Sequence, residues 1–521
     1  MYWCKIARSE HEFEEIAKLN YETFVEEIPQ HAPHPSGKRQ DAFHHENTYL
    51  IVLKDQQLIG MIALRDQRPF SLDGKIGEVE QALPKEALEG KLCEIRLLSV
   101  RKEYRKGRVF FLLARAFADY AYEKGYGAAV ISGTVRELKL YRQLGFEAFA
   151  DPVGNEDASF VPMFLTKQRY ELSIAARFQQ KKHTFFPGPN ELTQELKDVF
   201  HRSPISHRSY EFTERLKRVQ EKLKNLSGTD YVHLLSGSGT LANEAMIAQI
   251  SLLKKKGLIL VNGAFGERLM HQAKRWNLEF DVLNIEWGQS FDKQDMDNLT
   301  HKYDYGWLLA AHGETSTGML NDLNELRELC KENGIHLCLD CISSFGALPF
   351  DLKGVYLATG VSGKAIGSMT GLAFVFSNHL INESTCLPAY LDLGCYAEGN
   401  IPFTVSSQML EGLEVALESY TNDNRYAILN ERYSMLREIE EQLELEFLTQ
   451  QGYPMIVTFK TKSLPKYLGD DARLSGFDLH DQSLYLKERD WVQMSIIQPN
   501  FEQSFEKFRE WLSNYLAYEK Q

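Results

Sequence analysis

One lysine of the sequence stands in a stretch that has almost no bulky side chains around it. Lys364 lies within TGVSGKAIGSMTGLAFV, residues 359–375, and four of these residues are glycine. A long, hydrated cation gains little from such surroundings unless another molecule approaches it closely. A partly desolvated amine also loses its proton more readily and then acts as a nucleophile. We therefore interpret Lys364 as a reactive group and not as part of a solvated loop.

Three further groups follow apolar runs in the same half of the chain. Asp340 ends the run IHLCLD, so its carboxylate should be partly desolvated and should need a cation or hydrogen-bond donors. The turn SGSGT, residues 236–240, leads into a helical pattern, and its small residues expose backbone amides that favour a phosphate. Phe265 lies in the glycine-containing turn NGAFGER, where its ring can stack on a flat ligand or plug the turn.

One ligand accounts for these groups together, namely pyridoxal phosphate. Its phosphate needs a helix N-terminus and its ring needs a stacking face. Its pyridine nitrogen needs a carboxylate that keeps it protonated, and its aldehyde needs a lysine. The residue types therefore predict a pyridoxal phosphate site with Lys364 and Asp340 at its centre.

The elements that must position these groups alternate between strand and helix patterns. Apolar runs that read as strands occur at residues 231–237, 257–263, 305–313 and 335–340. Because helical patterns separate them, we expect a large α/β domain with a mainly parallel sheet over residues 184–384. A small C-terminal α/β subdomain is expected over residues 385–521. A separate α/β domain is expected over residues 1–166, and the polar, basic stretch 167–183 is interpreted as a linker.

The segments of the second half resemble, in order, those of the class V aminotransferases. They are FFPGPN, SHRSYEF, SGSGT, NGAFGER, HGETSTG, LDCISSFGALPFD and SGKAIGSMTGLAF. The resemblance covers about residues 184–515 and is strongest to the branch of alanine–glyoxylate and 2-aminoethylphosphonate–pyruvate transaminases. It implies a fold-type I, pyridoxal phosphate-dependent transferase. Such sites usually borrow residues from a neighbouring subunit, so the resemblance also implies a homodimer.

The resemblance implies a role for each matched residue. Lys364 would bond to the cofactor aldehyde and move a proton, Asp340 would pair with the pyridinium, and Phe265 would stack on the ring. Thr315 would donate a hydrogen bond near the ring oxygen, although it could instead simply end a strand. The phosphate ligands would be Ser238, Gly239 and Thr240, with Ser362 as a helper unless it caps a turn.

Two positions depart from the family pattern. Many members have glutamine before the lysine, where this chain has Gly363. Many also carry a carboxylate-binding arginine in a C-terminal strand, where this chain has Gln493 within WVQMSII. An amide cannot supply the bidentate, charged contact of a guanidinium. Arg489 or Arg208 could replace that arginine, or the substrate could lack the carboxylate.

The N-terminal domain resembles the GNAT acyltransferases over residues 1–165. Glu94 and Arg96, two apart on one strand, would face the acyl or amine site unless they form a surface ion pair. Tyr141 would protonate the departing thiolate or pack in the core. The coenzyme A pyrophosphate would be bound by the loop Arg105, Lys106, Gly107 and Arg108. This loop is one residue short and continues with Val109, so we expect a donor longer than acetyl, either an acyl-CoA or an acyl-carrier protein.

Composition narrows the class of protein. The chain has 521 residues, a net charge of −13 and seven cysteines, and it contains no long apolar run. These features favour a multidomain cytoplasmic protein without a nucleic-acid interface or membrane span. Cys338 and Cys341 form a C-x-x-C pair, but they lie in the apolar run IHLCLDC, which predicts a strand and argues against a redox role. The four histidines of HAPHPSGKRQDAFHH lack metal-ligand spacing, so no metal site is expected.

The sequence thus predicts a bifunctional enzyme, a transaminase joined to an acyltransferase. The simplest coupling is that the transaminase makes an amine and the acyltransferase acylates it, but the sequence does not show this order. Two alternatives remain open. A pyridoxal phosphate-dependent lyase or desulfurase would need a mobile cysteine, for which Cys395 is the loop candidate. A non-catalytic protein that senses pyridoxal phosphate or acyl-CoA is the other, although the presence of both Lys364 and Asp340 argues against it.

Overall fold

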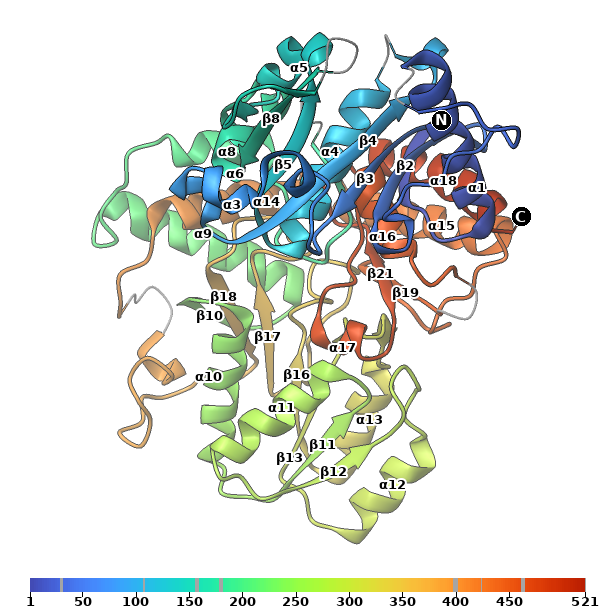
Figure 1. Ribbon diagram of the computed structural model, residues 1–521. Coiled ribbons are helices and arrows are strands. Elements are labelled where there is room, and N and C mark those ends of the chain that lie inside the picture. Colours follow the sequence, from blue (N-terminus) through green and yellow to red (C-terminus); the bar gives the residue numbers. More distant parts are fainter. Residues whose placement is uncertain are drawn as a thin grey trace. The chain divides into compact units, whose positions relative to one another are not determined.

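The computed structural model of the chain describes residues 1–28, 31–105, 108–154, 159–177, 181–396, 402–422, 424–460 and 464–520 (Figure 1). The chain forms two compact units. Unit 1 comprises residues 1–183, 467–478 and 507–521, and unit 2 comprises residues 184–466 and 479–506.

Unit 2 is built on a seven-stranded sheet in the order β10-β18-β17-β16-β13-β11-β12 (Figure 1). The strands are β10 (Tyr231–Ser236), β11 (Gly257–Val261), β12 (Phe280–Asn284), β13 (Trp307–Ala311), β16 (His336–Asp340), β17 (Leu357–Val361) and β18 (Leu372–Ser377). Strand β18 is antiparallel to β10 and β17, whereas the other neighbours are parallel. The prediction of a mainly parallel sheet is confirmed. The carboxyl ends of all strands except β18 meet at one edge, which is where open α/β sheets bind ligands.

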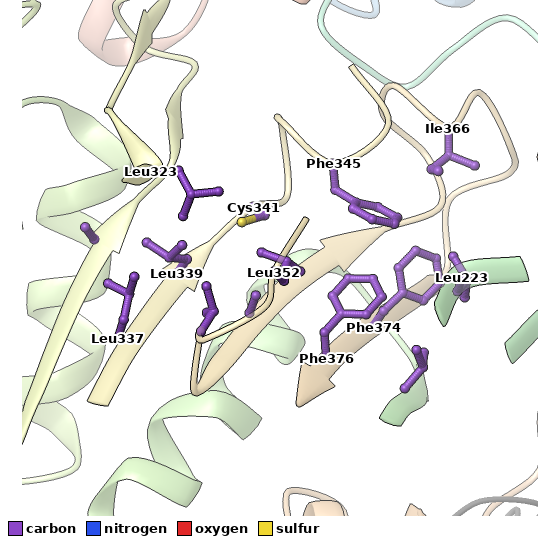
Figure 2. Close-up of a cluster of buried hydrophobic side chains, with 14 of the residues drawn as sticks. Leu223, Leu323, Leu337, Leu339, Cys341, Phe345, Leu352, Ile366, Phe374 and Phe376 are labelled. Carbon is purple, nitrogen blue, oxygen red and sulfur yellow. The ribbon is translucent and has the colours of Figure 1, made fainter. Parts of the chain in front are cut away.

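Helices cover both faces of this sheet. On one face lie α9 (Tyr210–Ser227), α12 (Lys293–Lys302), α13 (Leu323–Asn333) and α14 (Ser407–Asn422). Their apolar side chains pack against the strands in one core, in which Phe345, Phe374 and Phe376 lie side by side (Figure 2). On the other face lie α10 (Gly239–Ser251) and α11 (Ala264–Arg275). Cys341 belongs to the first core and Cys338 to the second, and both are free thiols.

The smaller elements of unit 2 flank the sheet. They are α8 (Gln194–Phe200), β14 (Gly313–Glu314), β15 (Met319–Leu320), α15 (Arg425–Gln442), β19 (Ile456–Phe459), α17 (Leu484–Lys487) and β21 (Val492–Ser495). Strands β19 and β21 form an antiparallel pair, and so do β14 and β15. The pair β14–β15 contains the first part of the segment HGETSTG, so that segment is held as a hairpin beyond the end of β13.

Unit 1 contains an eight-stranded sheet of mostly antiparallel strands. They are β1 (Tyr2–Ile6), β2 (Thr48–Lys54), β3 (Gln57–Arg65), β4 (Lys91–Val100), β5 (Tyr126–Thr134), β6 (Glu147–Ala148), β7 (Val153–Gly154) and β8 (Ser159–Thr166). Only β4 and β5 pair in parallel, and their register ends at Glu94 opposite Val130 although β4 continues to Val100 and β5 to Thr134. The two strands therefore diverge beyond Glu94. The main helices are α1 (Glu10–Tyr21), α4 (Val109–Lys124) and α5 (Leu138–Gln143).

Two C-terminal segments complete unit 1, which differs from the expected single subdomain over residues 385–521. The segments contain α16 (Leu468–Ser475) and the end of α18 (Phe501–Glu519). Ser475 Oγ donates to Cys4 O at 2.8 Å, and Arg8 pairs with Asp471 at 2.8 Å. Because β1 is an edge strand, these contacts cover backbone that would otherwise be open to pairing. The expected linker also differs, because α6 (Lys167–Leu172) and α7 (Ile174–Arg177) belong to unit 1.

Two kinds of feature are absent from the described residues, namely a helix that could span a membrane and a cluster of metal ligands. No helix within those ranges combines the length and the apolar character needed to cross a bilayer. In the same part of the chain no three His, Cys, Asp or Glu side chains converge as metal ligands. His34 and His44 instead contact single hydroxyls, Ser36 Oγ at 2.8 Å and Tyr49 Oη at 3.2 Å.

Candidate active site

Lys364 lies just beyond the end of β17, in a loop that neighbouring segments hold closely. Asn190 Nδ2 donates to Lys364 O at 2.6 Å, and Arg425 Nη2 donates to Ala365 O at 3.3 Å. A Cβ placed on Gly188 would lie 3.3 Å from Gly363 O and 3.7 Å from Lys364 Cγ. The small residues therefore allow close approach around the lysine, as its sequence context predicts.

The amine of Lys364 lies in surroundings that favour loss of its proton. Burial lowers the pKa of Lys364 to about 8; Asp340 opposes this shift and Arg268 adds to it. Within the described ranges, no carboxylate lies within 4.0 Å of Lys364 Nζ. The amine instead lies 5.3 Å from the centre of the Phe265 ring. A substantial uncharged fraction at neutral pH makes this amine nucleophilic.

Asp340 ends β16, and its hydrogen-bond donors are neutral groups. It is buried, and it accepts hydrogen bonds from Asn243 Nδ2 at 2.7 Å and from the Ile342 amide at 2.9 Å. The amide of Asn243 is oriented by Thr359, whose hydroxyl donates to Asn243 Oδ1 at 2.9 Å. Neither donor carries charge, so the carboxylate can still accept a cationic ligand group. The sequence did not predict Asn243, because its only signal was a polar residue in the first turns of α10.

The start of α10 carries the three predicted phosphate ligands. Ser238 is the N-cap, but its side chain makes no capping hydrogen bond and is exposed. The helix bonds begin with Leu241 N donating to Ser238 O at 2.9 Å, so the amides of Gly239 and Thr240 precede the helical ladder. A Cβ on Gly239 would lie 2.6 Å from Ile342 Cδ1, so a larger residue there would force the Ile342 side chain to shift. This helix N-terminus has the donors that an anion needs.

Phe265 is positioned by a buried glutamate that the sequence did not single out. Glu314 accepts the amides of Phe265 at 3.2 Å, Gly266 at 3.0 Å and Ser316 at 3.1 Å, and it also accepts the Ser316 hydroxyl. Burial raises the pKa of Glu314, whereas these donors lower it. The carboxylate therefore caps the first turn of α11 and fixes the ring beside Lys364.

Gln493 braces the backbone near the site, which differs from its expected contact with substrate. Its side chain is fully buried, and Nε2 donates to Thr315 O at 2.8 Å, Ser316 O at 3.0 Å and Thr458 Oγ1 at 2.7 Å. Both N–H groups of the amide are thus used inside the protein. Thr315 is itself buried, and its hydroxyl lies within hydrogen-bonding reach of Tyr453.

Ser362 also differs from its expected role as a phosphate helper. Its hydroxyl donates to Met369 O at 2.5 Å and to Leu372 O at 3.1 Å. These bonds close the turn that follows Lys364, which is the structural alternative for this residue. Arg208 lies before α9 and is exposed, and its backbone amide donates to Ser206 Oγ at 3.2 Å.

A group of aromatic and basic side chains that the sequence did not predict as a unit includes two residues whose charges interact with Lys364, namely Arg268 and His480. Its members are Arg268, Trp287, His480, Tyr485 and Arg489, and we call them the basic aromatic cluster. His480 Nε2 lies 3.2 Å from Tyr485 Oη. Burial lowers the pKa of His480 to about 4, and the charge of Lys364 contributes to this shift. The imidazole is therefore neutral at pH 7, with one ring nitrogen that donates a hydrogen bond and one that accepts.

In unit 1, Glu94 and Arg96 lie where β4 and β5 diverge, and both have partners inside the protein. The Glu94 carboxylate accepts Ser71 N at 2.8 Å, Ser71 Oγ at 2.6 Å and Leu72 N at 3.0 Å. Arg96 forms a bidentate pair with Asp41, at 2.8 and 3.1 Å. Glu94 is thus engaged in holding the turn at residues 71–72, which leaves it less suited to catalysis than expected.

The expected coenzyme A loop is partly engaged in contacts of its own. Arg105 donates to Val100 O at 2.8 Å and pairs with Glu27 at 2.6 Å, whereas Arg108 is exposed at the start of α4. Lys106 and Gly107 lie outside the described residues. Val109 is buried against β3, where a Cβ on Gly60 would lie 2.7 Å from Val109 Cγ1. Val109 fills this part of the core, which accounts for a larger residue at a position where the GNAT loop usually has a small one.

Tyr141 lies beside β5 beyond the point of divergence. A Cβ on Gly133 would lie 3.0 Å from Tyr141 Cδ2, and the Tyr141 ring packs edge-on against Phe146 at 6.2 Å. Burial raises the pKa of Tyr141, and hydrogen bonding to Thr134 opposes the rise. A tyrosine that stays protonated here fits a proton donor, and its packing fits a core residue equally.

Comparison with known proteins agrees with this geometry. Residues 190–384 match the family model "Aminotransferase class-V", and residues 19–115 match "Acetyltransferase (GNAT) domain". The chain is 30% identical over 282 residues to a 2-aminoethylphosphonate–pyruvate transaminase of Pseudomonas entomophila, covering 48% of this chain and 74% of the relative. It is 33% identical over 249 residues to the soluble hydrogenase 42 kDa subunit of Anabaena cylindrica, covering 44% of this chain and 64% of that protein. The chain thus spans about two thirds of the length of such relatives.

Solved structures share the fold of unit 2. An aspartate aminotransferase of subgroup IV from Thermus thermophilus matches with a TM-score of 0.57 and 23% identity, covering 64% of this chain and 99% of that one. A pyridoxamine–pyruvate aminotransferase from Mesorhizobium loti matches with a TM-score of 0.57 and 18% identity, covering 65% and 94%. The sheet topology, the residues at its carboxyl edge and the transaminase relatives agree with one another. The chain belongs to the class V aminotransferases and carries an acetyltransferase (GNAT) domain in its N-terminal part.

Proposed function

We propose that unit 2 is a pyridoxal phosphate-dependent transaminase that moves an amino group between a small amine or amino acid and an oxo acid or aldehyde. The observation that carries the proposal is the lysine itself. Lys364 has a pKa lowered to about 8 and lies 5.3 Å from the Phe265 ring centre, at the sheet edge where Asp340 ends its strand. The relative that is named as a transaminase acts between 2-aminoethylphosphonate and pyruvate.

The residues at this edge fit pyridoxal phosphate. The exposed Ser238 and the amides of Gly239 and Thr240 offer donors for its phosphate. Asp340 lacks a cationic hydrogen-bond partner within the described residues and suits a protonated pyridine nitrogen. When bound, the cofactor supplies an electron sink for the bonds at the substrate amine-bearing carbon.

The side chains of the protein would supply attachment, charge and proton transfer. Lys364 would hold the cofactor aldehyde covalently and, once released, would carry a proton at Nζ to and from the substrate carbon. Asp340 would pair with the pyridine nitrogen of the cofactor, and Asn243 and the Ile342 amide hold its carboxylate in place. Glu314 would keep the Phe265 ring in place through the first turn of α11.

A screen of amino donors tests this function. Purified protein loaded with pyridoxal phosphate should lose its visible absorbance as a productive donor converts the bound cofactor to the amine form. Pyruvate or glyoxylate should restore the absorbance. A protein that binds the cofactor at Lys364 but responds to no amine would contradict the transaminase proposal and would favour a sensing role.

The lyase or desulfurase alternative is less well supported. Cys395 Sγ lies 3.8 Å from Asp392 Oδ2, and burial and this carboxylate raise the pKa of the thiol. A raised pKa disfavours the thiolate that such chemistry requires. Cys395 also packs against the core beneath α10 and α11.

For unit 1, we propose acyl transfer from a thioester to an amine, with the product of unit 2 as an acceptor. The divergence of β4 and β5 beyond Glu94 supports it, because unpaired strand edges there offer amides to an acyl chain. The exposed Arg108 would contact coenzyme A or the acidic surface of an acyl-carrier protein. Turnover should be measured with acetyl-CoA and with long-chain acyl-CoA, and efficient use of acetyl-CoA would contradict the longer donor that we expect.

We also propose that unit 2 forms a homodimer. Tyr210, within the segment SHRSYEF, is 80% exposed, and Phe200, shortly before that segment, is 51% exposed. Large exposed apolar side chains are typical of protein interfaces. Light scattering should give twice the mass of one chain, and a fully active monomer would contradict the proposal.

A further inference from the structure

We propose that Arg268 and Arg489 bind the anionic group of the amino substrate, in place of the C-terminal strand arginine that this chain lacks. The inference rests on the proposed transaminase function and narrows its substrate class. The substrate would be an amine that carries a carboxylate or phosphonate a few bonds from its amino group.

Arg268 is a guanidinium without a carboxylate partner close to the reactive lysine. Its side chain is exposed, and no acidic group lies within 4.0 Å of it in the described parts of the chain. Its Cζ lies 4.7 Å from the centre of the Phe265 ring, and Lys364 Nζ lies 5.3 Å from the same centre. The two cationic groups are therefore separated by no more than the sum of these distances, about 10 Å. An amine and an acid group two or three bonds apart, with charge-assisted hydrogen bonds of about 2.8 Å, can reach both.

Arg489 is a second guanidinium, held flat on an aromatic surface. Its Cζ lies 3.5 Å from the Trp287 ring centre and 5.7 Å from that of Trp491. Its Nη1 donates to Tyr485 O at 3.4 Å, and the carboxylate of Glu488 lies 3.7 Å away. Both contacts are long, so they leave hydrogen-bonding capacity for a ligand. Stacking on Trp287 restricts the rotamers of Arg489, so less entropy is lost when an anion binds.

Tyr485 connects the two arginines. Its ring centre lies 6.3 Å from that of Trp287, on which Arg489 stacks. Burial raises the pKa of Tyr485, and the charge of Arg268 opposes this rise. His480 Nε2 lies 3.2 Å from Tyr485 Oη, and burial and the charge of Lys364 both lower the pKa of His480. The basic aromatic cluster therefore runs from Arg489 through Trp287 and Tyr485 to His480, whose backbone pairs with that of Gln493 beside Thr315.

Two acidic groups near the cluster, Glu267 and Glu314, have other partners, whereas Glu488 contacts Arg489 only at 3.7 Å. Glu267 accepts the indole N–H of Trp287 at 3.2 Å. Glu314 accepts the amides of the first turn of α11. Gln493 cannot bind the anion, because its amide N–H groups donate to Thr315 O, Ser316 O and Thr458. An anion near Tyr485 would therefore meet two guanidinium groups whose charge these carboxylates do not neutralise.

The test compares Arg268→Met and Arg489→Met with the control Arg275→Met, which removes an exposed arginine in the last turn of the same helix. Binding of phosphonoacetate and of glutarate to the cofactor-loaded full chain would be measured by calorimetry, which requires no turnover. Each single variant should raise the dissociation constant about 10- to 100-fold, as expected for loss of a charged hydrogen bond. The control should change it less than twofold. Arg268→Lys and Arg489→Lys should recover part of the affinity.

Three outcomes separate this inference from the proposed function. If both methionine variants bind the two anions as the unsubstituted protein does, the inference is overturned. If anion binding falls only in these variants while no amine is transaminated by any form, the anion site stands and the transaminase function fails. If a variant loses the borohydride-reducible bond at Lys364, its folding is disturbed, and the lysine variants decide the question.

Discussion

The acidity of Lys364 gives a quantitative prediction that depends on two charged neighbours of opposite sign. Burial lowers the pKa of its amine from 10.5 to about 8, which corresponds to about 3.4 kcal/mol. At pH 7 the uncharged fraction then rises from about 0.03% to about 10%. Arg268→Met should raise this pKa and Asp340→Asn should lower it, because the first charge lowers the pKa and the second raises it.

The size of the Arg268 effect follows from its distance. The guanidinium lies within about 10 Å of Lys364 Nζ, since both lie near one ring. Two unit charges 10 Å apart interact by about 0.4 kcal/mol in water and by about 1.7 kcal/mol at an effective dielectric constant of 20. Loss of Arg268 should therefore raise the pKa of Lys364 by about 0.3 to 1.2 units.

The assay follows the reaction of cofactor-free protein with pyridoxal from pH 6 to pH 10. Borohydride would trap the covalent adduct, and peptide mass spectrometry would quantify it at Lys364. The initial rate should rise about tenfold per pH unit below pH 8 and then level off. Arg275→Met, the matched control, should not move the midpoint. A midpoint near 10.5 in the unsubstituted protein, or a downward shift in Arg268→Met, would refute the reasoning.

Three further predictions concern stability and cofactor binding. Burial raises the pKa of Asp471 from 3.8 to about 6, so the free energy of unfolding should fall as the pH rises from about 4 to 6. In urea titrations over that range, Asp471→Asn should gain about 3 kcal/mol of stability relative to the unsubstituted protein, whereas the control Asp470→Asn should gain none. Glu314→Ala should destabilise unit 2 by at least about 2 kcal/mol in urea, because buried amides lose their acceptor, and a loss below 0.5 kcal/mol would exclude the capping role. Gly239→Ala should weaken binding of pyridoxal phosphate about tenfold, measured by fluorescence titration. Ile342→Ala in the same chain should restore that affinity, and no recovery would show that the steric argument is wrong.

The candidate site residues that could be predicted from the sequence are those that lie in or directly after one apolar run. Lys364, Asp340 and Ser238 each follow an apolar run, and parallel strands bring such positions to one edge without further information. For the same reason the mainly parallel sheet of unit 2 was predictable from alternating strand and helix patterns. These features depend on neighbours within about ten residues along the chain.

The rest depends on contacts between residues far apart in the chain. The role of Glu314 appears only when its carboxylate meets the amide of Gly266, 48 residues away. Gln493 occupies the position expected for a substrate ligand, but its amide turns to Thr315, 178 residues away. No periodicity or motif in one sequence reports which distant backbone a buried amide will meet. The boundary of unit 1 was missed for the same reason.

The contact between Arg8 and Asp471 also determines the order in which the two units can fold during synthesis. These residues are 463 positions apart, and at about 5 to 20 residues per second the ribosome needs roughly 25 to 90 s to reach the second after the first. All strands of the seven-stranded sheet lie within residues 231–377 and emerge earlier. Unit 1 is therefore begun first and completed last. Until residue 471 is made, the edge of β1 stays unpaired and can bind a chaperone or a strand of another nascent chain. A chain whose synthesis ends before residue 471 would contain the core of unit 2 but an incomplete unit 1.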